Sequence, residues 1–161
     1  MNKSGEYMKT QLAFIANFMW RESLRNINAQ LTASEARQFN SNDYYYLTTI
    51  YYLGNPRFSQ VAEALKLTKP AVSAIVRKLA GLGLVEKKQS PDDGRVFFAV
   101  VTEKGKQIVE GDEELYGRLE TLIRSSLQTK EHQTMMEELL AAMTREMEKL
   151  IRDEKTEESG I

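Results

Sequence analysis

Residues 58–88 read FSQVAEALKLTKPAVSAIVRKLAGLGLVEKK, a stretch that combines a short helix, a turn and a longer helix. Ser59 is placed to cap the short helix, which we expect over 60–65. Thr68 is placed to cap the longer helix, and Pro70 is tolerated in its first turn because a missing N–H loses no partner there. The apolar residues of the longer helix recur at a three-to-four spacing: Val72, Ile75, Val76 and Leu79. This pattern predicts a helix-turn-helix.

Two further patterns extend this stretch on both sides. β-rich runs at 84–89 and 96–102 flank the sequence SPDDGR, and an Asp-Gly pair between such runs is a strong hairpin signal. Upstream, Ser41 is placed to cap a helix over 42–53. The order helix, short helix, turn, helix and hairpin is that of a winged helix-turn-helix, which we place at 41–102.

Longer helical patterns surround this lobe at about 7–31, 103–127 and 130–153, with 32–40 as a polar connection. Their apolar stripes are wider than one small lobe can cover, so we expect 7–31 and 103–153 to be dimerisation helices. No repeat or low-complexity linker interrupts the sequence, which predicts a single domain over 1–161. The expected fold class is mainly α with a small antiparallel β wing, that is, a winged helix-turn-helix plus a helical dimerisation layer.

The composition argues against several classes of function. The chain has no cysteine, which excludes disulfides, thiolate nucleophiles and cysteine-ligated metal sites. A single histidine, His132, excludes a multi-histidine metal site within one chain, and nothing pairs it with a nucleophile. We therefore predict that the protein is not an enzyme and holds no metal or cofactor. No stretch approaches the roughly 18 to 20 apolar residues that span a bilayer, and residues 1–10 lack a signal-peptide core, so we expect a cytoplasmic protein without a membrane partner.

The distribution of charge is more informative than its sum. The net charge is −1, from 22 basic and 23 acidic residues, which argues against a protein that coats nucleic acid indiscriminately. Residues 66–95 nevertheless hold seven Lys or Arg against three acids, whereas 131–161 hold nine acids against four Lys or Arg. A locally basic middle suits a protein that meets phosphate with one face.

The basic residues of the middle segment lie where a DNA-binding protein needs them. Lys69, Ser73 and Arg77 are four residues apart and share the helix face opposite the apolar stripe. Groove reading requires this arrangement, because aliphatic side chains then face the core and polar ones face the bases. In the hairpin, Arg95 follows the tight turn and Asp93 stands two residues before it. An arginine at a wing tip can enter a minor groove, and the aspartate can orient its guanidinium by a charge-assisted pair.

These stretches resemble the MarR family of bacterial transcription regulators. FSQVAEALKLTKPAVSAIVRKLAGLGLVEKK matches its helix-turn-helix, SPDDGR its wing, and VVTEKG the start of the helix that follows. The resemblance implies a homodimer that binds a pseudo-palindromic operator on double-stranded DNA and releases it when a small, often aromatic, effector binds. It places Asp93 and Arg95 on the family's wing pair. The residues that we expect at the DNA are Ser59, Thr68, Lys69, Pro70, Ser73, Arg77, Lys78, Asp93 and Arg95.

Several aromatic residues leave two interpretations open. The resemblance implies an effector pocket between the long helices and the DNA-binding lobe, and Trp20, Tyr44, Tyr45 and Tyr51 could line it. Alternatively, the tyrosine rings pack their helix against its neighbours while their hydroxyls reach water. We favour packing for any single tyrosine.

We therefore predict a sequence-specific DNA-binding transcriptional regulator, a homodimeric repressor that a small effector releases from DNA. The alternative is a dimeric small-molecule-binding or adaptor protein that keeps the fold without binding an operator. Sequence-specific binding that weakens steeply with salt distinguishes the first from the second.

Overall fold

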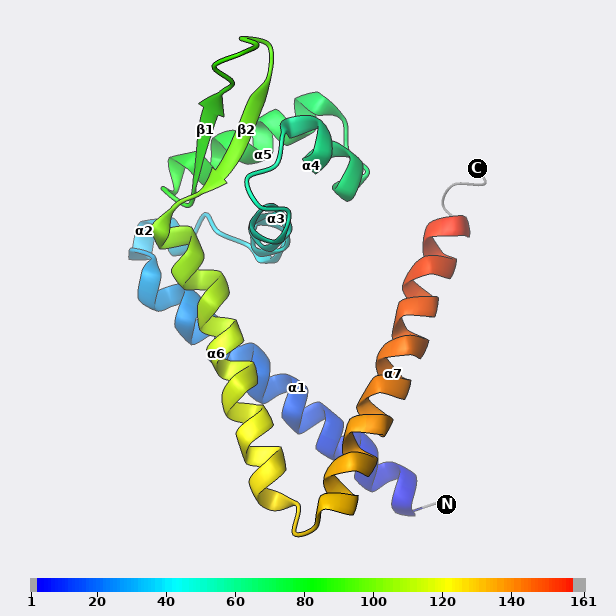
Figure 1. The fold of residues 1–161 in the computed structure, drawn as a ribbon. Helices are drawn as coiled ribbons and strands as arrows, with labels where there is room; N and C mark the ends of the chain where they lie inside the picture. The colour runs from blue at the N-terminus through cyan, green and yellow to red at the C-terminus, as the bar shows by residue number, and fades with distance from the viewer. Residues whose placement is uncertain (1–2, 158–161) are drawn as a thin grey trace. The chain divides into compact units, whose positions relative to one another are not determined.

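The fold comes from a computed structural model, which describes the backbone of residues 3–157 and the side chains of residues 7–150 (Figure 1). In chain order the elements are α1 (Lys3–Gln30), α2 (Ala33–Ala36), α3 (Ser41–Tyr52), α4 (Phe58–Leu65), α5 (Lys69–Gly81), β1 (Val85–Gln89), β2 (Phe97–Val101), α6 (Glu103–Ser126) and α7 (Lys130–Glu157). The fold is mainly helical with a two-stranded antiparallel wing, which confirms the predicted class. The chain divides after Tyr116 into two compact units.

Reciprocal side-chain caps begin α2 and α3. The Thr32 hydroxyl accepts a hydrogen bond from the Glu35 N–H (3.4 Å), and the Glu35 carboxylate accepts one from the Thr32 N–H (2.7 Å). Asn40 and Asp43 form the same pair at 3.1 and 2.8 Å. Each pair satisfies N–H groups that have no partner inside the helix. Two expectations are thereby corrected, because Ser41 lies inside α3 rather than capping it, and the expected connection over 32–40 contains α2.

The start of α4 also differs from the prediction. Its N-cap is Arg57, whose N–H donates to Gln60 Oε1 over 2.8 Å, so Ser59 is not the cap. The physical reason lies in the wing. The Ala99 N–H of β2 donates to Pro56 O over 2.9 Å, and Arg57 forms a β-bridge with Phe98. This pairing holds the chain extended up to Arg57, and the helix begins at the next residue.

α5 begins and ends as the sequence indicates. The Thr68 hydroxyl accepts a hydrogen bond from the Ala71 N–H (3.4 Å), and Pro70 lies in the first turn. The chain leaves α5 through Gly83 at φ +70°, a left-handed conformation that glycine adopts without a Cβ penalty. There the Leu84 N–H donates to Leu79 O over 2.9 Å. The chain is thus turned directly into β1.

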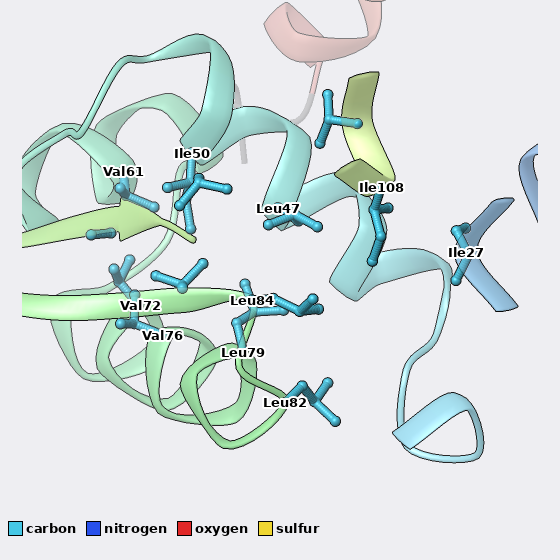
Figure 2. Packing of buried hydrophobic residues seen from close by; sticks show 14 of the residues in the cluster. Ile27, Leu47, Ile50, Val61, Val72, Val76, Leu79, Leu82, Leu84 and Ile108 are labelled. Atoms are coloured by element: carbon cyan, nitrogen blue, oxygen red, sulfur yellow. The ribbon is translucent and has the colours of Figure 1, made fainter. Parts of the chain in front are cut away.

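The core of the first unit lies where α3, α4, α5, the base of the wing and the start of α6 meet (Figure 2). Its fully buried members are apolar and include Leu47, Ile50, Val61, Val72, Val76, Leu79, Leu84 and Ile108. Ile27, near the end of α1, and Leu31, directly after it, extend the same cluster. Burial of each such side chain contributes about 1.5–3 kcal/mol relative to exposure, so this cluster fixes α5 against its neighbours.

α6 approaches two neighbours closely at glycines. A Cβ on Gly105 would lie 2.3 Å from the backbone oxygen of Leu84, and one on Gly111 would lie 2.3 Å from the Asn26 side chain of α1. Asn26 Nδ2 also donates to Ile108 O over 2.7 Å. Positions 105 and 111 therefore have no room for a side chain, because α6 passes the wing base at the first and α1 at the second.

The second unit joins the end of α6 to α7. Arg124 pairs with Glu120 and with Glu137, each at 2.9 Å, so one guanidinium links the two helices. The Thr129 hydroxyl accepts a hydrogen bond from the His132 N–H (3.2 Å) and so caps the first turn of α7. His132 itself is exposed, as expected of a residue at the start of a surface helix.

Large apolar side chains stay exposed on the outer helices. On α1 they include Met8, Leu12, Phe14, Ile15, Phe18 and Trp20; on α7 they include Met135, Leu139, Met143, Met147 and Leu150. So many large exposed apolar side chains on one helix indicate an interaction surface. Within the described part of the chain, none of the helices has the length and hydropathy that crossing a membrane requires.

We expect Gly105→Ala to destabilise the protein and Gly117→Ala, on the same helix, to leave it as stable or slightly more stable. The new Cβ at 105 meets a backbone oxygen at 2.3 Å, whereas that at 117 meets no atom within 4 Å. Overpacking costs about 1–3 kcal/mol, which exceeds the ~1 kcal/mol that alanine gains over glycine in helix propensity. Urea unfolding of both variants measures the difference. Equal stability of the two would contradict the close packing of α6 on the wing base.

Candidate nucleic-acid interface

α5 separates its apolar and polar side chains onto two faces. Val72 and Val76 are buried in the core, whereas Lys69 and Arg77 are exposed and Ser73 is half-buried. The Ser73 hydroxyl donates to Lys69 O over 3.0 Å, which leaves its oxygen able to accept a hydrogen bond. The spacing deduced from the sequence therefore gives a polar face on the exposed side of α5.

The N-terminal end of α5 carries two more of the expected DNA contacts. Thr68 and Pro70 are both exposed. The Thr68 oxygen already accepts the bond that caps α5, while its hydroxyl hydrogen is available for another acceptor. Both residues adjoin the positive end of the helix dipole, where a phosphate is favoured. A contact of either residue with DNA remains a prediction.

α4, α5 and the wing surround a hollow of about 300 Å³. Its lining residues are Arg57, Phe58, Ser59, Lys69, Ser73, Arg95, Val96 and Phe97. Four expected DNA contacts, Ser59, Lys69, Ser73 and Arg95, are thus brought together from separate elements. The lining also holds three cationic side chains and no carboxylate, so its electrostatic potential favours an anion.

The tip of the wing is organised by Asp93. Its carboxylate accepts a hydrogen bond from the backbone N–H of Arg95 (2.9 Å), and its backbone oxygen accepts one from the Val96 N–H (2.9 Å). The expected Asp–Arg pair therefore takes a different form, because the bond runs to the main chain of Arg95. Asp93 fixes the turn, and the Arg95 side chain is left exposed at its end.

The tip-side half of the wing is held over α4 by aromatic contacts. The rings of Phe58 and Phe97 lie 6.1 Å apart, and Lys87 Nζ lies 3.7 Å from the Phe97 centroid and 5.8 Å from that of Phe58. An ammonium over an aromatic face is attracted by the ring quadrupole. This contact joins the wing to the start of α4, beside the hollow.

Lys78 differs from the other expected DNA contacts, because its ammonium is engaged within the protein. Lys78 Nζ lies 2.6 Å from Asp43 Oδ2, and the Asp43 side chain is only 5% exposed. The same Asp43 oxygen also accepts a hydrogen bond from the N–H of Asn40, the residue that caps α3. The pair therefore fastens α5 to the start of α3. A contact between Lys78 and DNA stays a prediction, and it would compete with this pair.

Tyr44 links α3 to α6 through a buried carboxylate. Its hydroxyl donates to Asp112 Oδ2, and Asp112 is 4% exposed. The other oxygen of Asp112 is buried and has no hydrogen-bond partner among the described residues. Burial, reinforced by the bond to Asp112, raises the pKa of Tyr44, so the hydroxyl keeps its proton and remains a donor. The winged lobe is thus joined to the long helix by one buried hydrogen bond.

Two neighbouring tyrosines repeat this contact less deeply. Tyr51 donates to Glu110 over 3.2 Å, and Tyr52 donates to Glu113 over 3.4 Å. Burial also raises the pKa of each of these two hydroxyls. The hydroxyls of Tyr44 and Tyr51 therefore meet carboxylates rather than water. This agrees with packing of the rings, although the expected effector pocket is not thereby tested.

Trp20 and Tyr45 lie more openly. The Trp20 side chain is 50% exposed on α1, and Tyr45 is 58% exposed with its ring 6.1 Å from that of Tyr46. Their assignment to an effector pocket remains a prediction. Among the described residues no group of three or more His, Cys, Asp or Glu side chains is arranged to hold a metal ion.

Sequence reasoning missed Arg57 as a residue of the basic hollow. The available signal was a basic residue directly before Phe58-Ser59 at the start of a helix. Its significance depends on the β-bridge to Phe98, a contact between residues 41 positions apart that local patterns do not show.

Comparison with known proteins identifies the family. The sequence model of the MarR family matches residues 39–97, which include α3, α4, α5 and β1. The HTH-type transcriptional regulator YxaD of Bacillus subtilis is 30% identical over 125 residues, covering 76% of this chain and 84% of YxaD. The chain belongs to the MarR family of transcriptional regulators. This confirms the resemblance and the expectation of a regulator rather than an enzyme.

Other relatives agree with this assignment. The HTH-type transcriptional regulator MhqR of Bacillus subtilis is 33% identical over 66 residues, a match that covers 41% of this chain and less than half, 46%, of MhqR. The solved MepR–DNA complex of S. aureus has a TM-score of 0.65 at 18% identity, covering 87% of this chain and 98% of that one. At this identity the similarity to MepR shows the fold alone.

We expect Tyr44→Phe to cost more stability than Tyr51→Phe. Loss of the Tyr44 hydroxyl leaves both oxygens of the buried Asp112 without a partner, a cost of about 1–3 kcal/mol. Tyr51→Phe removes a 3.2 Å bond to a carboxylate that is only half-buried, so water can replace it. Urea unfolding at neutral pH measures both. A cost for Tyr51→Phe equal to that for Tyr44→Phe would contradict the special role of Asp112.

The ion pair at the start of α2 predicts a pH dependence. Hydrogen bonds from Lys104, at 2.7 Å, and from Thr32 lower the pKa of Glu35 from 4.5 to about 2. Because the folded-state pKa is depressed, the carboxylate stabilises the fold fully above pH 4.5 and loses this contribution as the pH falls toward 2. The stability difference between the wild type and Glu35→Gln should shrink over that range in urea unfolding.

Glu103→Gln is the matched control for this measurement. It removes an exposed carboxylate that lies 3.7 Å from the Lys106 ammonium, a surface pair of small energy. Its effect on stability should be small at every pH. If the difference in unfolding free energy between the wild type and Glu35→Gln does not change with pH, the charge of the Glu35 carboxylate does not stabilise the fold.

Proposed function

We propose that this protein is a sequence-specific DNA-binding transcriptional regulator that acts as a homodimer. The proposal is carried by the placement of Lys69, Ser73 and Arg77 on the exposed face of α5, with Arg95 at the wing. An exposed polar helix of this kind fits the major groove, and an arginine wing fits the adjacent minor groove. The solved DNA complexes of MepR and of Streptococcus pneumoniae FabT, which share the fold, support this assignment.

Exposed apolar side chains on α1 and α7 support self-association. Among them are Leu12, Phe14, Leu139 and Leu150, each 49% or more exposed. A second copy of the chain is the partner that every molecule has available, and a two-fold axis would pair identical surfaces. Such a dimer reads two half-sites about 34 Å apart, which suits a pseudo-palindromic operator.

The regulatory part of the proposal is a repressor that a small effector releases from DNA. The junction of α3 and α6 supports it, because Tyr44 and Tyr51 join the winged lobe to the long helix through hydrogen bonds. A ligand that binds one arrangement of this junction better than another would shift the spacing of the two recognition helices. By linkage, DNA must weaken that ligand by the same factor. A change in Trp20 fluorescence with candidate aromatic ligands, and its loss when DNA is added, would test this part.

The DNA-binding part is tested with fragments selected from random-sequence DNA. We expect Arg95→Ala to weaken binding at least about tenfold, because one charge-assisted contact contributes about 1.5–3 kcal/mol, with the fold intact. Arg77→Ala should weaken binding and also relax sequence preference by about 1–3 kcal/mol if Arg77 reaches a base edge. Arg37→Ala, at an exposed arginine after α2, is the matched control and should bind as the wild type does.

The outcomes separate the proposal from its rival. If the wild type selects no sequence even at low salt, the protein is an adaptor or ligand-binding relative rather than a regulator. If it binds, affinity should fall steeply with salt because phosphate contacts release counterions. Unchanged affinity in Arg95→Ala would show that the wing makes no contact.

A further inference from the structure

We propose that Arg57 and Lys69 form a clamp for a single backbone phosphate of DNA, seated in the hollow between α4, α5 and the wing, while Arg95 at the rim of the hollow keeps its proposed place in the minor groove. This inference rests on the proposed function and adds a contact, that of Arg57, and a role for the hollow. We call Arg57 and Lys69 the phosphate clamp.

The location of the hollow identifies its occupant. One wall is α5, which carries Lys69 and Ser73, and another is the wing, which carries Arg95 and Val96. If α5 enters a major groove and the wing enters the adjacent minor groove, the sugar–phosphate strand that separates the two grooves must pass between them. The hollow lies on that path. A phosphate of this strand is therefore the group that faces its cations.

The chemistry of the lining agrees with a phosphate. Three cations come from three different parts of the chain, and none of the lining residues is acidic. The hydroxyls of Ser59 and Ser73 add hydrogen-bonding groups, while Phe58 and Phe97 add apolar walls. Apolar walls lower the local dielectric constant and strengthen charge-assisted hydrogen bonds to an anion.

Arg57 is held in place before any ligand arrives. Its N–H donates to Gln60 Oε1 over 2.8 Å, its backbone bridges Phe98 of β2, and its guanidinium carbon lies 5.9 Å from the centroid of the Phe98 ring. Pro56, the preceding residue, accepts the bond from Ala99. These contacts limit the freedom that Arg57 would lose on binding, which favours affinity. They also tie the Arg57 guanidinium to β2, the strand whose first residue, Phe97, lines the hollow.

The clamp should bind DNA without reading its sequence. Phosphate contacts set position and register but carry no direct base information. Loss of Arg57 should therefore weaken selected and random-sequence DNA by the same factor. Arg77, which lies on the face of α5 outside this lining, should instead affect the ratio between the two.

The test compares the wild type with Arg57→Gln on selected and on random-sequence duplexes over a range of salt. We expect a loss of about tenfold or more on both, as for one charge-assisted contact, with an unchanged ratio. For Arg57→Gln, the slope of log affinity against log salt should be less steep than that of the wild type by about 0.9 for each phosphate contact that is lost. Arg57→Lys should recover part of the affinity because it restores the charge. Arg37→Gln is the matched control and should behave as the wild type.

A second measurement locates the phosphate. Duplexes that carry a single neutral methylphosphonate, moved stepwise along each half-site, should show one position where the wild type loses affinity and Arg57→Gln loses little more. That non-additivity is the signature of a direct contact. Thermal unfolding of Arg57→Gln should differ little from that of the wild type, since the α4 cap uses the backbone N–H of Arg57 and only the exposed contact of the guanidinium with Phe98 is lost.

Each outcome decides between the claims. No DNA binding by the wild type overturns the proposed function and the clamp together. Binding by the wild type with unchanged affinity and salt slope in Arg57→Gln overturns the clamp alone. A loss confined to selected DNA, or additive losses at every methylphosphonate position, would also overturn it, because Arg57 would then read bases or act only through the fold.

Discussion

The apolar face of α5 packs against α3, α4 and the base of the wing, and the polar face takes its position from that packing. Val72, Val76 and Leu79 are fully buried on the inner side (Figure 2). Their burial fixes the rotation of the helix about its axis, since turning it would expose these side chains at a cost of about 1.5–3 kcal/mol each. Lys69 and Arg77 point outward as a consequence. The hydrophobic core thus decides which side chains of α5 are exposed.

The wing extends this arrangement by a second set of contacts. β2 pairs with β1 on one edge and with the residues before α4 on the other, so the hairpin is supported from both sides. The contacts among Phe58, Phe97 and Lys87 also hold the wing against the start of α4. Arg95, in the hairpin loop, and Arg57, beside β2 at Phe98, are therefore held relative to α5. A basic hollow between helix and wing follows from this support.

Polar contacts join the winged lobe to the helices outside it. Lys104 of α6, which also pairs with Glu35 of α2, donates a hydrogen bond to Leu82 O at the end of α5. The hydrogen bond from Tyr44 of α3 to the buried Asp112 of α6 adds a second link. Buried partners of this kind are costly to separate, because each separation leaves a polar group without water. These polar contacts, together with the packing of Ile108 in the shared core, are where the long helices and the winged lobe are coupled.

The sequence alone determined the features that depend on local spacing and turn chemistry. It predicted the helix-turn-helix, the cap at Thr68, the hairpin at SPDDGR and the polar face of α5, because helical periodicity and Asp-Gly turns are encoded by neighbouring residues. Only the tertiary structure decided the start of α4, the partner of Lys78, the partner of Tyr44 and the place of Arg57. Each of these depends on a contact between residues distant in sequence, and local patterns carry no information about such contacts. The core brings those residues together, and with them the basic hollow.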